Sequence, residues 1–199
     1  MSDRSLEELR TAAAESPRSA DARARLGTAL LKAGEIREAE TELRAAVELD
    51  PACAPAWVNL GGIHLGRWEF DAAIDANRKA AEAEPRLAIA RFNQAIAYLH
   101  LGESEKALGL LTETVELEPQ HGGAFYHLGI ILHAQGRAEE AKVCVAYSEE
   151  LGYSPSRMSV EALARAKAAS KAAKAASSTP DVTPAVGPLG ERHGTAEGR

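Results

Sequence analysis

Two asparagines, Asn59 and Asn93, are the side chains in this sequence best suited to bind another polypeptide. A side-chain amide carries both N–H donors and a carbonyl acceptor, so one asparagine can pair with the N–H and the C=O of an extended peptide backbone. The two residues are 34 positions apart, and the same step leads back to Arg25 and on to His127. The pattern indicates main-chain capture, provided that the fold brings these positions into one row.

Motifs for catalysis and for metal binding are absent from the sequence. It has no His-Glu-x-x-His, no Gly-x-x-x-x-Gly-Lys and no Gly-x-Ser-x-Gly. No two of the six histidines are three or four residues apart, and the two cysteines, Cys53 and Cys144, form no Cys-x-x-Cys. We therefore expect no catalytic residue, no metal site and no cofactor.

A repeat of 34 residues is the element that must position the asparagines. Prolines mark it at Pro17, Pro51, Pro85 and Pro119. Small residues follow the same period, in the columns Ala39, Ala73, Ala107, Ala141 and Gly27, Gly61, Ala95, Gly129. Proline cannot continue a helix, and small residues let two helices approach closely. The period predicts a helix–turn–helix unit whose copies stack into a solenoid, because one unit cannot bury its own apolar face.

These columns resemble the tetratricopeptide repeat family. The resemblance is carried by Trp57-Val58-Asn59-Leu60-Gly61 and by Phe125-Tyr126-His127-Leu128-Gly129, each followed by the periodic alanines. It covers residues 20–153 and implies an all-α, right-handed α-solenoid of four repeats, at 20–53, 54–87, 88–121 and 122–153. In the second repeat Trp68 stands in the turn column that elsewhere holds Gly34, Gly102 and Gly136, so we expect that turn to differ in shape.

The helix pairs of the four repeats are predicted at 20–33 with 37–49, 54–65 with 71–83, 88–101 with 104–117, and 122–135 with 138–151. Residues 1–16 form an incomplete repeat, with a helix over about 5–14, that caps the N-terminal end. Residues 154–176 are expected to form a C-terminal capping helix, which starts at Ser154-Pro155. Residues 177–199 are rich in Pro, Thr, Gly and Ser and are expected to be disordered.

Composition and charge exclude several classes of function. The net charge of −6 argues against nucleic-acid binding, which needs Lys and Arg to neutralise phosphates. No apolar run approaches the ~20 residues of a membrane-spanning helix, and the N-terminus has no apolar signal segment. We therefore expect a cytoplasmic protein, and the abundance of Ala, Arg and Gly suggests a bacterial source.

In this family the first helix of each repeat lines a concave groove. The resemblance places ten side chains on that groove: Arg25, Lys32, Val58, Asn59, Phe92, Asn93, Ile96, Tyr126, His127 and Ile130. Related solenoids hold a peptide main chain with a ladder of asparagines, the role that we assign to Asn59 and Asn93. In the columns that face the core, His64 and Gln94 are expected to form a buried hydrogen-bonded pair.

The remaining groove residues would give the site its selectivity. Phe92, Tyr126 and Ile130 would bind an apolar side chain of the ligand, and Arg25 and Lys32 would add a charge bias. Together these features predict a scaffold or adaptor that is not an enzyme and that binds a peptide segment of a partner protein. The sequence does not identify that partner.

Two alternatives keep the same fold. One is a self-assembling scaffold, a homo-oligomer whose groove accepts the N-terminal helix of a neighbouring copy, as the resemblance to magnetosome-associated members of the family implies. The other is a bacterial chaperone for secreted or assembly subunits. Chaperones of that kind typically have three repeats, so a fourth full repeat counts against this second alternative.

Overall fold

Helices account for all the regular structure in residues 3–155, the part of the chain that the computed structural model describes. Nine helices follow one another over this range. They are α1 (Asp3–Glu15), α2 (Ala20–Ala33), α3 (Ile36–Leu49), α4 (Ala54–Gly66), α5 (Phe70–Ala83), α6 (Ala88–Leu101), α7 (Ser104–Leu117), α8 (Gly122–Ala134) and α9 (Ala138–Glu150). The eight helices α2–α9 begin and end within one residue of the predicted ranges.

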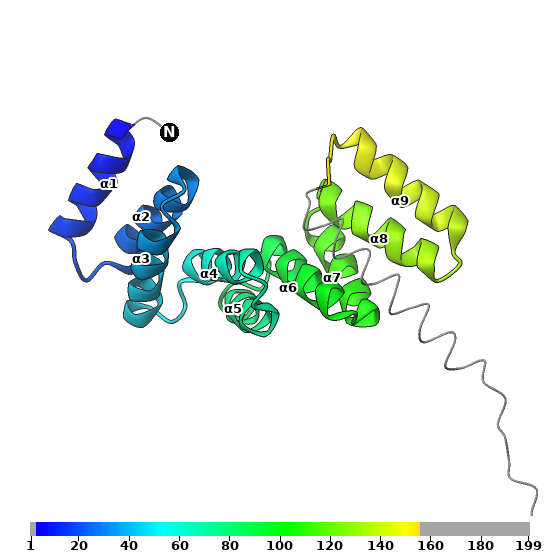
Figure 1. The fold of residues 1–199 in the computed structure, drawn as a ribbon, viewed down its shortest axis with the longest axis horizontal. Helices are drawn as coiled ribbons and strands as arrows, with labels where there is room; N and C mark the ends of the chain where they lie inside the picture. The colour runs from blue at the N-terminus through cyan, green and yellow to red at the C-terminus, as the bar shows by residue number, and fades with distance from the viewer. Residues whose placement is uncertain (1–2, 156–199) are drawn as a thin grey trace, which may run out of the picture.

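Neighbouring helices in the sequence are also neighbours in space, as expected for a solenoid. The pairs α2 with α3, α4 with α5, α6 with α7 and α8 with α9 pack against each other, and each pair contacts the next. The pairs follow one another along an arc (Figure 1). Helix α1 packs on α2, where its Leu6, Leu9 and Ala13 contact the cluster around Leu30. The predicted C-terminal helix over 154–176 and the predicted tail over 177–199 lie outside the described residues, apart from Ser154 and Pro155.

Small residues at the 34-residue period allow each helix pair to close tightly. Ala39, Ala73 and Ala107 are completely buried where the two helices of a pair meet. A methyl group added to Gly27 would lie 2.6 Å from Cγ of Leu43 on the partner helix. Each fully buried large side chain between the helices contributes about 1.5–3 kcal/mol through apolar area removed from water. The packing therefore depends on the alternation of small and large residues across each pair.

The turn inside the second repeat contradicts the expectation drawn from its sequence. Gly34, Gly102 and Gly136 have φ angles of 83°, 80° and 86°, in the left-handed region that glycine adopts at no steric cost. Trp68, which stands in the same column, adopts φ 66° and so has the same left-handed conformation. The turn keeps its shape because the Trp68 ring packs edge-on against Phe70, with the ring centroids 5.8 Å apart, and this contact offsets the cost of a left-handed non-glycine residue.

The predicted pair of His64 and Gln94 is not formed. Nδ1 of His64 lies 2.5 Å from Oε2 of Glu69, a residue of the following turn. Gln94 is buried in α6. The prediction was wrong because a carboxylate in the adjacent turn can reach the imidazole more directly than an amide in the next repeat.

Candidate functional site

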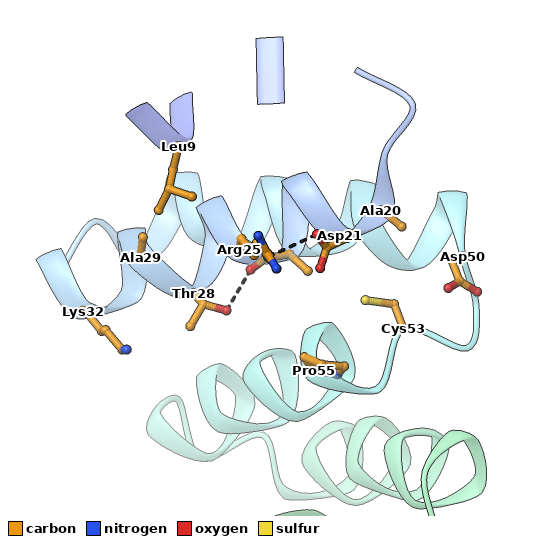
Figure 2. Close-up of a pocket in the computed structure, with 11 residues that line it drawn as sticks. Leu9, Ala20, Asp21, Arg25, Thr28, Ala29, Lys32, Asp50, Cys53 and Pro55 are labelled. Atoms are coloured by element: carbon orange, nitrogen blue, oxygen red, sulfur yellow. Dashed lines mark hydrogen bonds and ion pairs between the residues drawn. The ribbon is translucent and has the colours of Figure 1, made fainter. Parts of the chain in front are cut away.

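Two hollows open on the first helices of the repeats, where the predicted site residues lie. The N-terminal hollow, of about 590 Å³, lies between α1, α2 and the start of α4 (Figure 2). Its lining residues are Leu9, Ala20, Asp21, Ala24, Arg25, Thr28, Ala29, Lys32, Asp50, Cys53 and Pro55. The second, which we call the amide hollow, has a volume of about 550 Å³. Its lining residues are Leu31, Ile36, Val58, Asn59, Gly62, Ile63, Gly66, Arg67, Ile89 and Asn93.

Half of the predicted site residues line these two hollows. Arg25 and Lys32 line the N-terminal hollow, and Val58, Asn59 and Asn93 line the amide hollow. The two hollows adjoin, because the amide of Asn59 in one bonds to the hydroxyl of Thr28 in the other. The structure therefore brings together the predicted amides and the predicted cations on the surface of α2, α4 and α6.

Asn59 is held by a side chain of the preceding repeat. Its Nδ2 donates a hydrogen bond of 2.8 Å to Oγ1 of Thr28. The Thr28 hydroxyl in turn donates to the main-chain oxygen of Ala24, at 2.7 Å. Among the described residues this is the one hydrogen bond recorded for the Asn59 side chain, so its Oδ1 and its second N–H remain available to a ligand.

Asn93 is held by a residue that the sequence reasoning missed. Its Nδ2 donates a hydrogen bond of 3.2 Å to Oδ1 of Asn77, on the second helix of the preceding repeat. Asn77 is completely buried, and its own Nδ2 donates to the main-chain oxygen of Ala73 at 2.9 Å. The signal that could have found it is the 34-residue column Leu43, Asn77, Leu111 and Val145, in which Asn77 is the polar exception.

The predicted cations remain exposed. Arg25 pairs through Nε with Oδ2 of Asp21, at 3.1 Å, but the two side chains are 70% and 75% exposed (Figure 2). An ion pair with that much solvent contact contributes little, so Arg25 can turn to a ligand at small cost. Lys32 is exposed near the end of α2 and has no ion pair with any residue in 3–155. This edge of the site therefore presents two exposed cations beside the carboxylates of Asp21 and Asp50.

A third cation at the site is already neutralised. Arg67 lines the amide hollow and donates through its NH2 nitrogen to Oε2 of Glu40, at 2.5 Å. This hydrogen bond holds the pKa of Glu40 below its usual range, with a smaller contribution from the charge of Arg44. Arg67 therefore closes one side of the hollow, and we do not count it among the ligand-binding charges.

Apolar side chains form the walls of the amide hollow. Ile36 and Ile89 are 41% and 37% exposed, and Leu31 and Val58 are half-buried beside them. An exposed apolar cluster of this kind is typical of a binding surface. Selectivity for an apolar ligand side chain can thus come from these residues, of which sequence reasoning named only Val58.

Two predicted groove residues are not accessible at all, and this corrects the sequence-based site. Ile96 is 5% exposed and packs in the core cluster with Leu99 and Leu128. His127 is 1% exposed, between the rings of Phe92 and Tyr126, whose centroids lie 6.0 and 5.3 Å away. Both side chains are therefore part of the packing between helices and not of a surface that a ligand can reach.

The other three predicted residues are half-buried but line neither of the two hollows. The ring of Phe92 packs on His121, with centroids 4.4 Å apart, and that of Tyr126 packs near Tyr153, at 5.5 Å. Ile130 lines a separate hollow of about 410 Å³ between α8 and α9. The structure therefore does not join these three to the asparagines.

The described part of the chain offers no arrangement for metal chemistry or for spanning a membrane. Within residues 3–155, no group of three or more His, Cys, Asp or Glu side chains is placed to hold a metal ion. Over the same residues, every helix is too short or too polar to cross a lipid bilayer. What the site does offer is hydrogen-bonding, apolar and cationic contacts on one surface.

A model of the tetratricopeptide repeat matches the sequence over residues 24–88, 69–113 and 92–144. These overlapping matches cover more than half of the chain. The chain belongs to the tetratricopeptide repeat family. Members of this family bind partner proteins and are typically not enzymes, so the chain is a protein-interaction scaffold.

Solved structures of MamA have the same fold as this tetratricopeptide repeat protein. One, described as the crystal structure of MamA, is 24% identical, with a TM-score of 0.64 over 74% of this chain and 86% of that one. MamA from Desulfovibrio magneticus RS-1, residue 41 to its end, is 21% identical, with a TM-score of 0.64 over 75% and 85%. No curated protein matches the sequence. The likeness to MamA supports the all-α solenoid.

Proposed function

We propose that this tetratricopeptide repeat protein binds an extended segment of a partner protein across α2, α4 and α6. Asn59 and Asn93 pair with the main chain of that segment. The observation that supports this proposal is that both amides line one hollow of about 550 Å³, and each uses one N–H in a hydrogen bond to another side chain of the protein. The Oδ1 and the remaining N–H of each amide match the donor and acceptor that a peptide main chain presents.

The surroundings of the two amides define the class of segment. Apolar ligand side chains would lie against Leu31, Ile36 and Ile89, and an acidic group would lie toward Arg25 and Lys32. The ligand is therefore an extended segment with small or aliphatic residues next to a carboxylate. A surface of this size favours micromolar binding, about −8 kcal/mol.

Replacing Asn59 and Asn93 together with alanine is expected to weaken peptide binding at least tenfold, because each amide gives up two main-chain hydrogen bonds, each worth about 0.5–1.5 kcal/mol. The probe is a fluorescein-labelled peptide selected from a random library on the full wild-type chain, titrated by fluorescence anisotropy. Gln120→Ala removes an exposed amide outside both hollows and serves as the matched control. Affinity within twofold of wild type, with the helical circular dichroism unchanged, would remove the proposal.

A version of the same peptide with N-methyl groups on its main-chain amides distinguishes recognition of the main chain from recognition of the side chains. Methylation removes single N–H donors while the side chains stay the same. We expect the affinity to fall at the positions that face Asn59 and Asn93 and to change little elsewhere. Sedimentation of the peptide-free protein at several concentrations shows whether a second copy competes for the groove, as the self-assembling alternative requires.

A further inference from the structure

Each groove amide can face the ligand in two ways, and buried hydrogen bonds decide which. The nitrogen and oxygen of an asparagine amide exchange places when the group turns over, so its partners fix its direction. The main-chain oxygens of Ala24 and Ala73 settle the question here, because a carbonyl oxygen can only accept. Each of these oxygens ends a series of hydrogen bonds that leads to a groove amide, and it fixes the direction of every other bond in its series.

The series of hydrogen bonds that ends at Ala73 fixes the orientation of the Asn93 amide. Asn77 lies 2.9 Å from the oxygen of Ala73 and must present Nδ2 to it. Its Oδ1 then faces Asn93 and can only accept, so Asn93 must present Nδ2 in turn, at 3.2 Å. The Oδ1 of Asn93 is thereby directed away from the core.

The series of hydrogen bonds that ends at Ala24 fixes the Asn59 amide in the same orientation, with Nδ2 toward the protein. Thr28 has one hydroxyl hydrogen, which it donates to the oxygen of Ala24 at 2.7 Å. With that hydrogen used, the hydroxyl accepts, so Asn59 must present Nδ2 to it, at 2.8 Å. Thr28 is half-buried on α2 and lines the N-terminal hollow (Figure 2).

We propose that Asn77 and Thr28 are positioning residues, which hold the amides of Asn93 and Asn59 with Oδ1 and one N–H toward the ligand main chain. This inference rests on the proposed function. As a consequence, Asn59 and Asn93 both direct Oδ1 toward the ligand site before the ligand binds. A pre-oriented amide loses less conformational freedom on binding than a free one.

The environment of Asn77 supports a role beyond packing. The side chain is completely buried at a position where the first and third repeats carry the equally buried Leu43 and Leu111. Stability alone favours leucine there, because burying an amide costs free energy that an apolar side chain does not incur. A methyl group at Gly61 would lie 2.0 Å from Nδ2 of Asn77, so the amide is also confined from the side. The second repeat thus has an asparagine where leucine would give greater stability, and this asparagine is the residue that contacts Asn93.

Asn77→Leu tests this directly in the full chain, because it restores the residue of the neighbouring repeats. We expect a thermal midpoint equal to or above that of wild type, together with a five- to tenfold loss of affinity for the labelled peptide. In ¹⁵N spectra the side-chain NH₂ pair of Asn93 should move to the positions of an exposed asparagine. A purely structural Asn77 would leave the peptide affinity unchanged even though the NH₂ pair of Asn93 moves, and this result would overturn the proposal.

Thr28 gives a second test that does not disturb the core. Thr28→Val keeps the shape and removes the hydroxyl, and is expected to weaken peptide binding about fivefold, whereas Thr28→Ser should retain wild-type affinity. Thr112→Val is the matched control, because Thr112 on α7 makes the same kind of bond, to the oxygen of Leu108 at 2.9 Å, away from both hollows. Equal losses in Thr28→Val and Thr28→Ser would show that the hydroxyl orients nothing.

The two proposals fail in different ways. If the Asn59 and Asn93 double variant binds the peptide as wild type does, main-chain capture is wrong, and the positioning roles are wrong with it. If that variant loses binding while Asn77→Leu and Thr28→Val do not, main-chain capture stands and the positioning roles alone are wrong.

Discussion

Replacing Gly61 with alanine is expected to lower the free energy of unfolding by about 2 kcal/mol, the usual cost of forcing an extra carbon into a packed core. The new methyl carbon would lie 2.0 Å from Nδ2 and 2.7 Å from Cγ of Asn77. That side chain cannot swing aside without giving up its bond to Ala73. The helices α4 and α5 must therefore separate, and this separation is the source of the lost stability.

The neighbouring glycine gives the matched control. A methyl group at Gly62 would meet no atom within 4 Å, and Gly62 lies inside α4 like Gly61. Gly62→Ala should therefore raise the free energy of unfolding by about 0.5–1 kcal/mol, the helix preference of alanine over glycine. Urea unfolding followed by circular dichroism measures both variants. Equal changes of the same sign would show that Asn77 does not confine Gly61.

The sequence was sufficient for the helices because their boundaries depend on local chemistry. A proline that cannot continue a helix follows each of the second helices α3, α5 and α7, and left-handed glycines end α2 and α6. Each of these two signals depends on the type of a single residue and not on its contacts in the fold. Trp68 is the exception, because the contact that stabilises its left-handed conformation joins side chains that the sequence alone does not place.

The candidate site was predictable only in part, because exposure depends on how repeats pack and not on their period. Asn59 and His127 occupy the same column, yet the first lines a hollow while the second is 1% exposed. The difference arises from neighbouring side chains: Asn59 has Gly62 beside it in the hollow, whereas His127 has two aromatic rings. A periodic sequence therefore predicted which residues share a row but not which rows a ligand can reach.

The site that we propose consequently lies nearer the N-terminal end of the solenoid than the sequence suggested. The apolar contacts expected from Phe92, Tyr126 and Ile130 are replaced by those of Ile36 and Ile89, which stand next to the asparagines. The aromatic residues of α6 and α8 surround the buried His127 instead.

His127 makes the C-terminal half sensitive to acid, and we expect about 3 kcal/mol of stability to be lost between pH 6.5 and pH 4. The pKa of His127 is lowered from 6.5 to about 4, chiefly by burial and to a smaller extent by the charges of the nearby His100 and His121. Neither ring nitrogen has a hydrogen-bond partner among the described residues. Above pH 6.5 both folded and unfolded chains hold the imidazole neutral and stability is complete.

Below pH 6.5 the unfolded chain binds a proton that the folded protein does not, so stability falls until pH 4, where the folded state is protonated too. Urea unfolding at pH 7.5 and pH 5 should differ by about 2 kcal/mol for wild type. In His127→Leu this difference should largely disappear, because leucine fills the buried site without titrating and without leaving a hydrogen-bond partner behind. A wild-type pH dependence that persists undiminished in His127→Leu would assign the acid sensitivity to other groups.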